Sequence, residues 1–529
     1  MSLRAQGRNF RLMAVFSLLG MGFSFLVGAQ TARQFADGMQ WLGYQAFFNA
    51  IEFPVTLFGA NWLNPSLIKF INQERQHVAK VLWTNTILKC VFSSLLGLVA
   101  LSLAWVCDIR GELLWMFACL LGTNITLSCG LSQAFDAFGK GALDARWHSI
   151  TQFLYLVAAL GLLWGLNIQG AQIWLLSLAE FGITCLYIAG LWWTFHRKVK
   201  PLPPSWSARQ AREQIRMGWP LILSGLTEKL SGNLDITCLK WAGGAEGAVW
   251  CALYSIPQRI LRILRQVIGQ AFRQFTPVMV KNYHADRALS ARTFSMGFRL
   301  VGVFALTLWV VMGVNAEGLI TVLFSGSYAA SAPCLVWLMG GFAFRHLAKV
   351  CNNVLIAAGD SRTLARNQYV VAGFVVVAVP TGAFAFGAQG AAAGVMATYL
   401  AAFLQAWRQT LHCYEGHERP DVLRLGTPFV VSAGLCLWWI PIVRKAAEGW
   451  GLQVWELSRE FFTALSGSLH VKVGYVHEVV VGSVSLLPSL ALSLVVTVIL
   501  LVGLGPFTPD EKLKVRGLLA GMTGTGRPA

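Results

Sequence analysis

Arginine recurs through the stretch IPQRILRILRQVIGQAFRQFTP, residues 256–277, at a spacing that places the guanidinium groups on one side of a helix. At about 100° per residue, its four arginines and two of its glutamines fit within about 140° of the helix surface. These residues are Arg259, Arg262, Arg265, Gln266, Gln270 and Arg273. Guanidinium groups donate paired, charge-assisted hydrogen bonds to phosphate oxygens, so the stripe predicts a surface that binds an anion.

The composition places this stripe in a membrane protein. The chain has 529 residues, of which 56% are hydrophobic and 12% are charged, and its mean hydropathy is +0.57. Soluble proteins usually contain about 25% charged residues. The formal net charge is +18. The Lys and Arg residues nevertheless gather in short loops between apolar runs, so we expect no nucleic-acid partner.

The cysteines give no sign of a metal site. There are 11 of them, mostly inside the apolar runs and without a CxxC pair. We therefore expect buried apolar side chains rather than zinc ligands or disulfides. No phosphate-binding P-loop motif occurs either, so the sequence predicts no metal, no cofactor and no catalytic residues.

The apolar runs predict an all-α integral membrane protein. A helix needs about 20 mostly apolar residues to cross a bilayer, and fourteen segments qualify. They are approximately 10–29, 42–67, 81–106, 113–135, 149–166, 171–195, 217–241, 246–275, 293–314, 329–357, 367–386, 389–411, 425–443 and 485–506. We expect the first to be an uncleaved helix rather than a signal peptide. The loops that this order assigns to the cytoplasm carry most of the Lys and Arg residues, which predicts that both termini are cytoplasmic.

An internal repeat divides the chain. AFGKGALDAR at 137–146 resembles AAGDSRTLAR at 357–366, and the same offset continues to a QGA triplet in each half. Two six-helix bundles that both start in the cytoplasm predict parallel repeats around a central cavity. The expected parts are an N-terminal bundle at 1–195, a basic cytoplasmic linker at 196–216, a C-terminal bundle at 217–411, and two extra transmembrane helices with a cytoplasmic tail at 412–529. Within the outer-face segment 444–484, the stretch LQVWELSREFFTAL at 452–465 is either an interfacial amphipathic helix or an ordered loop.

Further charged residues lie inside the predicted spans. Arg345 and Lys349 are one turn apart, with Asn352 on the same face. The remaining intramembrane cations include Lys89, Lys229 and Arg299, and the acids are Glu52, Glu180, Glu228 and Asp235. An arginine at the bilayer centre costs on the order of 2.5–3.5 kcal/mol, so these cations must face water or acidic partners. The cations outnumber the acids, which favours an anionic ligand over the alternative that they serve only as structural salt bridges.

Three of the acids are candidates for coupling transport to an ion. Glu52, Glu228 and Asp235 each lie in a predicted span, where a carboxylate is suited to bind H⁺ or Na⁺. The alternative is that they only balance neighbouring cations, as Glu228 does beside Lys229.

Several runs resemble a known family. The stretch LDITCLKWAGGAEGAVWCALYSIPQRI, followed by FTPVMVKN, resembles the seventh and eighth spans of the polysaccharide-flippase (Wzx-like, PST) branch of the MOP exporter superfamily. GLITVLFSGSYAASAPCL, LIAAGDSR and FGAQGAAAG resemble later family motifs, and the resemblance covers roughly residues 8–411. The matching positions are Asp235, Gly243 to Gly247, Tyr254, Pro277, Gly326, Tyr328 and Gly387 to Gly394. Ile236 departs from the family's usual arginine, and the last two spans lie beyond its usual twelve.

The resemblance implies a flippase that moves undecaprenyl-pyrophosphate-linked oligosaccharide units across the bacterial inner membrane by alternating access. Such units are precursors of O-antigen in lipopolysaccharide, of capsule or of exopolysaccharide. The arginines of the stripe, with Arg345 and Lys349, would then hold the pyrophosphate, while Gln266, Gln270 and Asn352 would hydrate or bind the glycan. The expected partners are the lipid-linked oligosaccharide, membrane lipids, and a polysaccharide polymerase and glycosyltransferases of the same pathway.

Two alternatives remain open at this level. One is an ion-coupled multidrug exporter of the same superfamily, although its cationic substrates would prefer an acidic cavity. The other is a membrane polymerase or glycosyltransferase, whose acids and histidines would lie on the long outer segment. That segment holds Glu456, Glu460, His470 and His477, and no motif organises them.

Overall fold

Helices form the regular structure of the described residues. The computed structural model describes residues 3–52, 78–106, 109–131, 140–199, 203–358, 360–414 and 473–503, together with isolated positions between these ranges. Within these ranges no strand occurs, and seven helices are long and apolar enough to cross a membrane by length and composition. The all-α membrane prediction is therefore confirmed. The thirteenth predicted span and most of the segment 444–484 lie outside the described residues.

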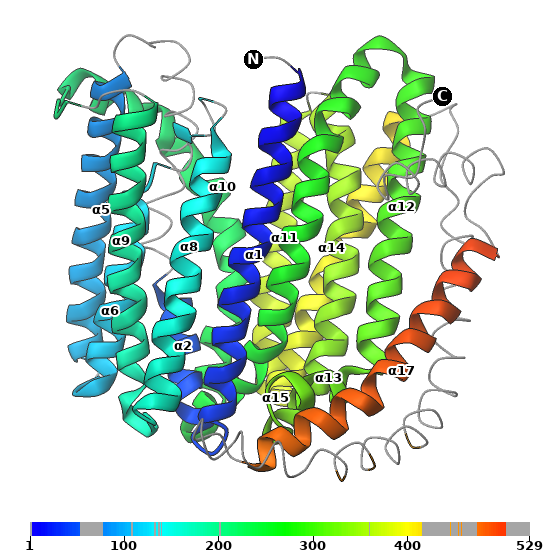
Figure 1. The fold of residues 1–529 in the computed structure, drawn as a ribbon. Coiled ribbons are helices and arrows are strands. Elements are labelled where there is room, and N and C mark those ends of the chain that lie inside the picture. The colour runs from blue at the N-terminus through cyan, green and yellow to red at the C-terminus, as the bar shows by residue number, and fades with distance from the viewer. Residues whose placement is uncertain are drawn as a thin grey trace. The chain divides into compact units, whose positions relative to one another are not determined.

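Two compact units divide the chain, and each is described by itself. The first comprises Met1–Ile263 and Val375–Ala391. Its helices are α1 (Leu3–Gln34), α2 (Met39–Ile51), α5 (Val78–Val106), α6 (Glu112–Ser128), α8 (Gly141–Leu160), α9 (Trp174–Lys198), α10 (Ala208–Ala242) and the first part of α11 (Gly247–Ala285). Within this unit α1 packs along α8, α8 and α6 both pack against α9, and α10 contacts α2 and α5 (Figure 1).

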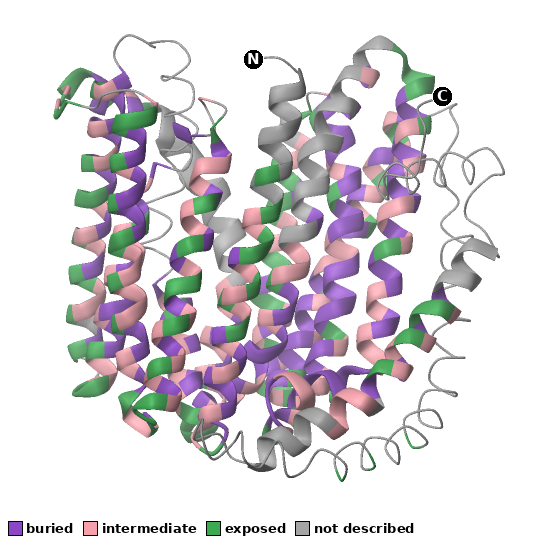
Figure 2. Ribbon diagram, in the orientation of Figure 1, coloured by how far each residue is buried: buried purple, intermediate pink, exposed green. Residues whose placement is uncertain are grey.

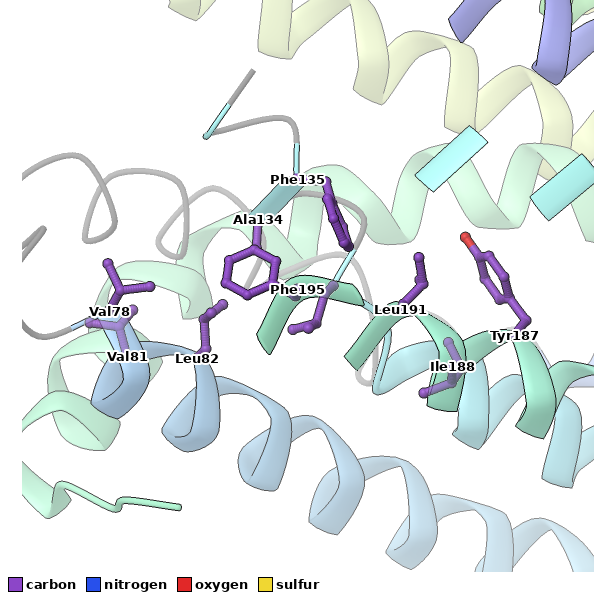
Figure 3. Packing of buried hydrophobic residues seen from close by; sticks show 10 residues of the cluster. Val78, Val81, Leu82, Ala134, Phe135, Tyr187, Ile188, Leu191 and Phe195 are labelled. Atoms are coloured by element: carbon purple, nitrogen blue, oxygen red, sulfur yellow. The ribbon is translucent and has the colours of Figure 1, made fainter. Parts of the chain in front are cut away.

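An apolar cluster ties α5 and α9 to the segment that follows α6. Val81 and Leu82 of α5 lie with Leu191 and Phe195 of α9, and all four are at most 1% exposed (Figure 3). Phe135 meets Phe195 edge to face, with ring centroids 5.2 Å apart. Burial of such large side chains stabilises the contact between these two helices.

Helix α5 has its burial pattern reversed relative to a helix of a soluble protein. Leu95 and Leu98 are 56% and 63% exposed, whereas the polar Asn85, Lys89 and Ser93 are buried. Exposed and buried residues also alternate along the other described helices of this unit (Figure 2). An apolar outer face with polar groups inside suits a lipid environment, because hydrocarbon cannot hydrate polar side chains.

The second unit continues α11 from Leu264 and comprises Leu264–Phe374, Ala392–Ser466 and Lys472–Ala529. Its other helices are α12 (Arg287–Val314), α13 (Ala316–Leu323), α14 (Ala332–Ala358), the two outer parts of α15 (Ser361–Cys413) and α17 (Val473–Gly503). Within it, α12 packs along α14, and α17 contacts α12 and α13 (Figure 1). The short helix α13 has no counterpart among the predicted spans, because eight residues are too few to register as a span.

Helix α15 is broken at the position where two spans were predicted to meet. Phe386 and Gly387 have non-helical dihedral angles, and Gly387 has φ of +60°. That backbone conformation favours glycine, which lacks the Cβ atom that would be strained there. The break separates the predicted spans 367–386 and 389–411, so the expected turn at Gly387 is confirmed.

Hydrogen bonds attach α17 to the junction between α12 and α13. Asn315, between α12 and α13, donates to Ser493 Oγ at 3.2 Å and accepts from Ser489 Oγ at 2.7 Å. Both serines are fully buried, while Leu487 of the same helix is 64% exposed. Polar contacts of this kind hold membrane helices together where the hydrophobic effect gives little preference for one helix neighbour over lipid. The predicted two-bundle division and its repeat symmetry stay predictions.

A close approach between α2 and α11 generates the first testable prediction. A Cβ atom added to Gly43 would lie 1.6 Å from the carbonyl oxygen of Ala248, so the two backbones must separate to accommodate it. We expect Gly43→Ala to destabilise the protein by on the order of 3 kcal/mol through overpacking. Thermal denaturation of the detergent-solubilised protein measures the effect. Gly22→Ala on α1, where an added Cβ would meet nothing within 4 Å, is the matched control; equal melting temperatures would contradict the prediction.

Candidate functional site

Helix formation across the arginine stripe is confirmed, since α11 runs unbroken from Gly247 to Ala285. Arg259 is anchored in the first unit, where its Nη1 atom donates to the carbonyl oxygen of Gly28 on α1 at 2.8 Å. A Cβ atom on residue 28 would lie only 2.6 Å from that nitrogen. The guanidinium therefore occupies space that glycine leaves open, and α1 positions it.

Arg262, one turn further along α11, has an exposed side chain. It interacts electrostatically with Glu180 on α9, as does Arg259. Tyr155 on α8 is 7% exposed and interacts with both Glu180 and Arg259. Four helices of the first unit thus contribute to one charged group, which we call the α11–α9 cluster: Gly28, Tyr155, Glu180, Arg259 and Arg262.

A second group of cations lies in the second unit. His346 on α14 is 5% exposed and interacts electrostatically with Arg345, Lys349 and Arg265. The guanidinium of Arg345 lies over the ring of Tyr399 on α15, 5.4 Å from its centroid. Lys349 is exposed. Within the predicted stripe, Arg265 therefore lies with the cations of α14. Arg259 and Arg262 instead interact with Glu180 of α9.

The predicted glycan-binding residue Asn352 belongs to a chain of amides in the second unit. Asn367 donates through Nδ2 to Asn352 Oδ1 at 3.4 Å and to Gln409 Oε1 at 2.6 Å. Asn367 is 4% exposed. Sequence reasoning missed Asn367 and Gln409, which lie at the ends of the predicted spans 367–386 and 389–411 beside other polar residues. Side chains of Gln266, Gln270 and Arg273, which were also predicted to bind substrate, lie outside the described ones.

Asp235 is the best described of the predicted ion-coupling residues. Its side chain is 3% exposed and accepts hydrogen bonds from Tyr254 Oη at 2.6 Å and from Gln258 Nε2 at 2.9 Å. Tyr254 and Gln258 lie one turn apart on α11, so the carboxylate links α10 to α11. Glu52 is buried at the C-terminal cap of α2. The side chain of Glu228 is not among the described ones.

The α11–α9 cluster in the first unit and the cations around His346 in the second unit are each suited to attract an anion. Guanidinium and ammonium groups offer donors without acceptors, which matches phosphate oxygens. Among the described residues, no group of three or more His, Cys, Asp or Glu side chains is placed to hold a metal ion.

The buried carboxylate generates the second prediction. Tyr254→Phe removes the phenol that donates to Asp235, and a hydrogen bond to a charged group contributes about 1.5–3 kcal/mol. We expect a lower melting temperature of the purified protein. Tyr369→Phe removes a hydroxyl from a side chain that is 58% exposed and should leave the melting temperature unchanged. Equal stability of the two variants would show that the Tyr254–Asp235 bond contributes nothing measurable.

Comparison with known proteins shows that the chain has a fold found in transporters. The polysaccharide biosynthesis protein family matches residues 44–283. A structure titled as the lipid II flippase MurJ in an inward closed conformation superposes with a TM-score of 0.61 and 11% identity, covering 81% of this chain and 92% of that one. A multidrug resistance MATE family transporter of the MOP superfamily, inward-facing, has a TM-score of 0.53 and 15% identity, covering 76% and 96%.

A MOP superfamily transporter from Pyrococcus furiosus, whose title reports a binding pocket of reverse polarity, has a TM-score of 0.50 and 13% identity over 77% of this chain and 96% of that one. No curated protein matches the sequence. At these identities the structures show the fold alone. The resemblance drawn from the sequence is thereby confirmed: the chain matches the polysaccharide biosynthesis protein family over residues 44–283, and it is a multi-pass membrane protein with the fold of the MOP superfamily transporters.

Proposed function

We propose that the protein moves undecaprenyl-pyrophosphate-linked oligosaccharide units across the bacterial inner membrane by alternating access, with both termini in the cytoplasm. The observation that carries the proposal is the exposed guanidinium of Arg262, in the middle of a helix of 39 residues. The matching family supports a role in polysaccharide biosynthesis. The fold supports transport rather than catalysis.

Solvation restricts where the side chain of Arg262 can lie. If this side chain faced lipid, it would cost on the order of 2.5–3.5 kcal/mol on insertion scales. An exposed guanidinium in the middle of a membrane helix is therefore stable in an aqueous passage. There it can bind a soluble or membrane-anchored anion. A pyrophosphate headgroup presents the oxygen geometry that a guanidinium binds through paired hydrogen bonds.

Residues of the second unit would make further contacts with the substrate. In this unit, Arg265, Arg345 and Lys349 would also bind the pyrophosphate. The amide chain of Asn352, Asn367 and Gln409 offers donors and acceptors to the hydroxyl groups of a sugar. Arg273 would capture the substrate at the cytoplasmic end. A polysaccharide polymerase and glycosyltransferases of the same pathway would supply and consume the substrate.

Coupling to H⁺ or Na⁺ would use Asp235, Glu52 or Glu228. Asp235 is favoured because its carboxylate joins α10 to α11, so a change in its charge would alter its hydrogen bonds to Tyr254 and to Gln258, the residue before Arg259.

An ion-coupled multidrug exporter is the second candidate function, favoured by the likeness to a MATE family transporter. Such a protein would need acids to hold a cationic drug. In the described clusters the acids are hydrogen-bonded or close to arginines, while Arg262 and Lys349 are exposed. This distribution favours the anionic substrate.

The third prediction tests the function in cells. A strain that lacks its own copy of the gene receives the wild-type protein or Arg262→Gln at equal membrane levels. We expect the variant to lose most surface polysaccharide and to accumulate the complete lipid-linked unit, because a neutral amide cannot replace a guanidinium on pyrophosphate. Extracted lipid-linked oligosaccharide and surface polysaccharide are quantified together.

The matched control is Arg209→Gln. Arg209 lies at the start of α10 in an exposed pair with Glu213, and such pairs contribute at most about 1 kcal/mol to stability. This variant should behave as the wild type. Normal surface polysaccharide with Arg262→Gln would refute the anion path and favour the exporter, and drug-efflux assays on the same strains would then identify its substrates.

A further inference from the structure

Arg345 lies against an aromatic ring to which the proposed anion site assigns no role. Its guanidinium carbon is over the ring of Tyr399, 5.4 Å from the ring centroid. At separations up to about 6 Å, the face of an aromatic ring attracts a cation. Arg345 lies on α14 and Tyr399 on the second part of α15, and both belong to the second unit. The contact therefore joins two helices of one compact unit.

A close approach of α14 and α15 places the Tyr399 ring. Gly341 lies one turn before Arg345, and a Cβ atom added to it would be 3.4 Å from Met396 Cα and 3.6 Å from Tyr399 Cδ2. Because glycine has no side chain, the backbone of α15 comes close to α14 here. The ring of Tyr399 consequently lies beside Gly341 and under the guanidinium of Arg345.

Further contacts continue the same interface along both helices. Phe344 of α14 and Phe403 of α15 stack with their ring centroids 6.1 Å apart. Farther along, Thr410 Oγ1 donates to the carbonyl oxygen of Cys351 at 3.3 Å. Tyr399 thus belongs to a packed helix pair, and this packing restricts where its ring can lie.

We propose that Tyr399 is a positioning residue that holds the guanidinium of Arg345 ready for the phosphate groups of the substrate. The inference rests on the proposed function, since it requires that Arg345 binds an anion. A long side chain loses conformational entropy when a ligand immobilises it, and a guanidinium that is already held loses less. An aromatic ring is neutral, so unlike a carboxylate it holds the guanidinium without cancelling the charge that attracts phosphate.

The fourth prediction tests this role by direct binding. Inorganic pyrophosphate is titrated into the purified full-length protein in lipid nanodiscs, and the heat of binding is measured. We expect Tyr399→Leu to bind pyrophosphate on the order of fivefold more weakly than the wild type, because leucine has no ring face to attract the guanidinium. Tyr399→Phe keeps the ring face and should bind as the wild type does.

The matched control is Trp193→Leu. Trp193 lies near the end of α9, outside the proposed site, and its ring centroid is 5.1 Å from the guanidinium carbon of Arg197. Its side chain is 54% exposed, so its replacement removes a contact of the same kind without opening a buried space. This variant should leave the affinity for pyrophosphate unchanged.

A double-mutant cycle shows whether Tyr399 acts through Arg345. Arg345→Gln should weaken binding, and adding Tyr399→Leu to it should weaken binding no further. If Arg345→Gln binds pyrophosphate as tightly as the wild type, or if the wild type does not bind it, the proposed anion path through Arg345 fails and the positioning role fails with it.

Other outcomes overturn the positioning role alone. Binding that depends on Arg345 but is unchanged in Tyr399→Leu would do so. So would a Tyr399→Phe variant as weak as Tyr399→Leu, since the hydroxyl rather than the ring face would then be responsible. Losses that add in the double variant would show that Tyr399 acts independently of Arg345.

Discussion

A guanidinium group inside a membrane must meet water or an anion, and this requirement governs the interior of the protein. In the first unit it accounts for three features that are far apart in the sequence. Gly28 leaves space for Arg259 and offers its carbonyl oxygen, while Glu180 supplies negative charge to Arg259 and Arg262. Tyr155 fills the intervening space with a buried ring. Each would be hard to explain in a helix that only crosses lipid.

The same solvation rule shapes the helix surfaces. Leucines and valines face outward on α5 and α17, whereas Asn85, Lys89 and Ser93 of α5 and Ser489, Ser493 and Thr497 of α17 are buried. Because lipid chains are as apolar as leucine, hydrophobic burial alone cannot choose a partner for such a helix. Specific polar contacts and small residues do so instead. Asn315 holds two serines of α17, and Gly43 allows α2 to approach α11 closely.

The fold is shared by a lipid II flippase and multidrug transporters, so it does not by itself choose a substrate. The substrate class is therefore inferred from the charged and polar side chains. Exposed Arg262 and Lys349 favour an anion, and the amides joined through Asn367 favour a ligand rich in hydroxyl groups. A glycan on a pyrophosphate lipid satisfies both preferences, whereas a cationic drug satisfies neither.

The sequence by itself determined the membrane class, the approximate positions of most described helices, the break at Gly387 and the existence of the arginine stripe, because hydropathy and a period of 3.6 residues are local properties of one chain segment. It could not show α13, which is too short for a span. Nor could it show that Arg259 binds Gly28, that Glu180 interacts electrostatically with Arg262, or that Asn367 joins Asn352 to Gln409. Those contacts depend on which helices become neighbours and how they are rotated. Periodicity says which face is polar, and only tertiary packing decides what that face meets.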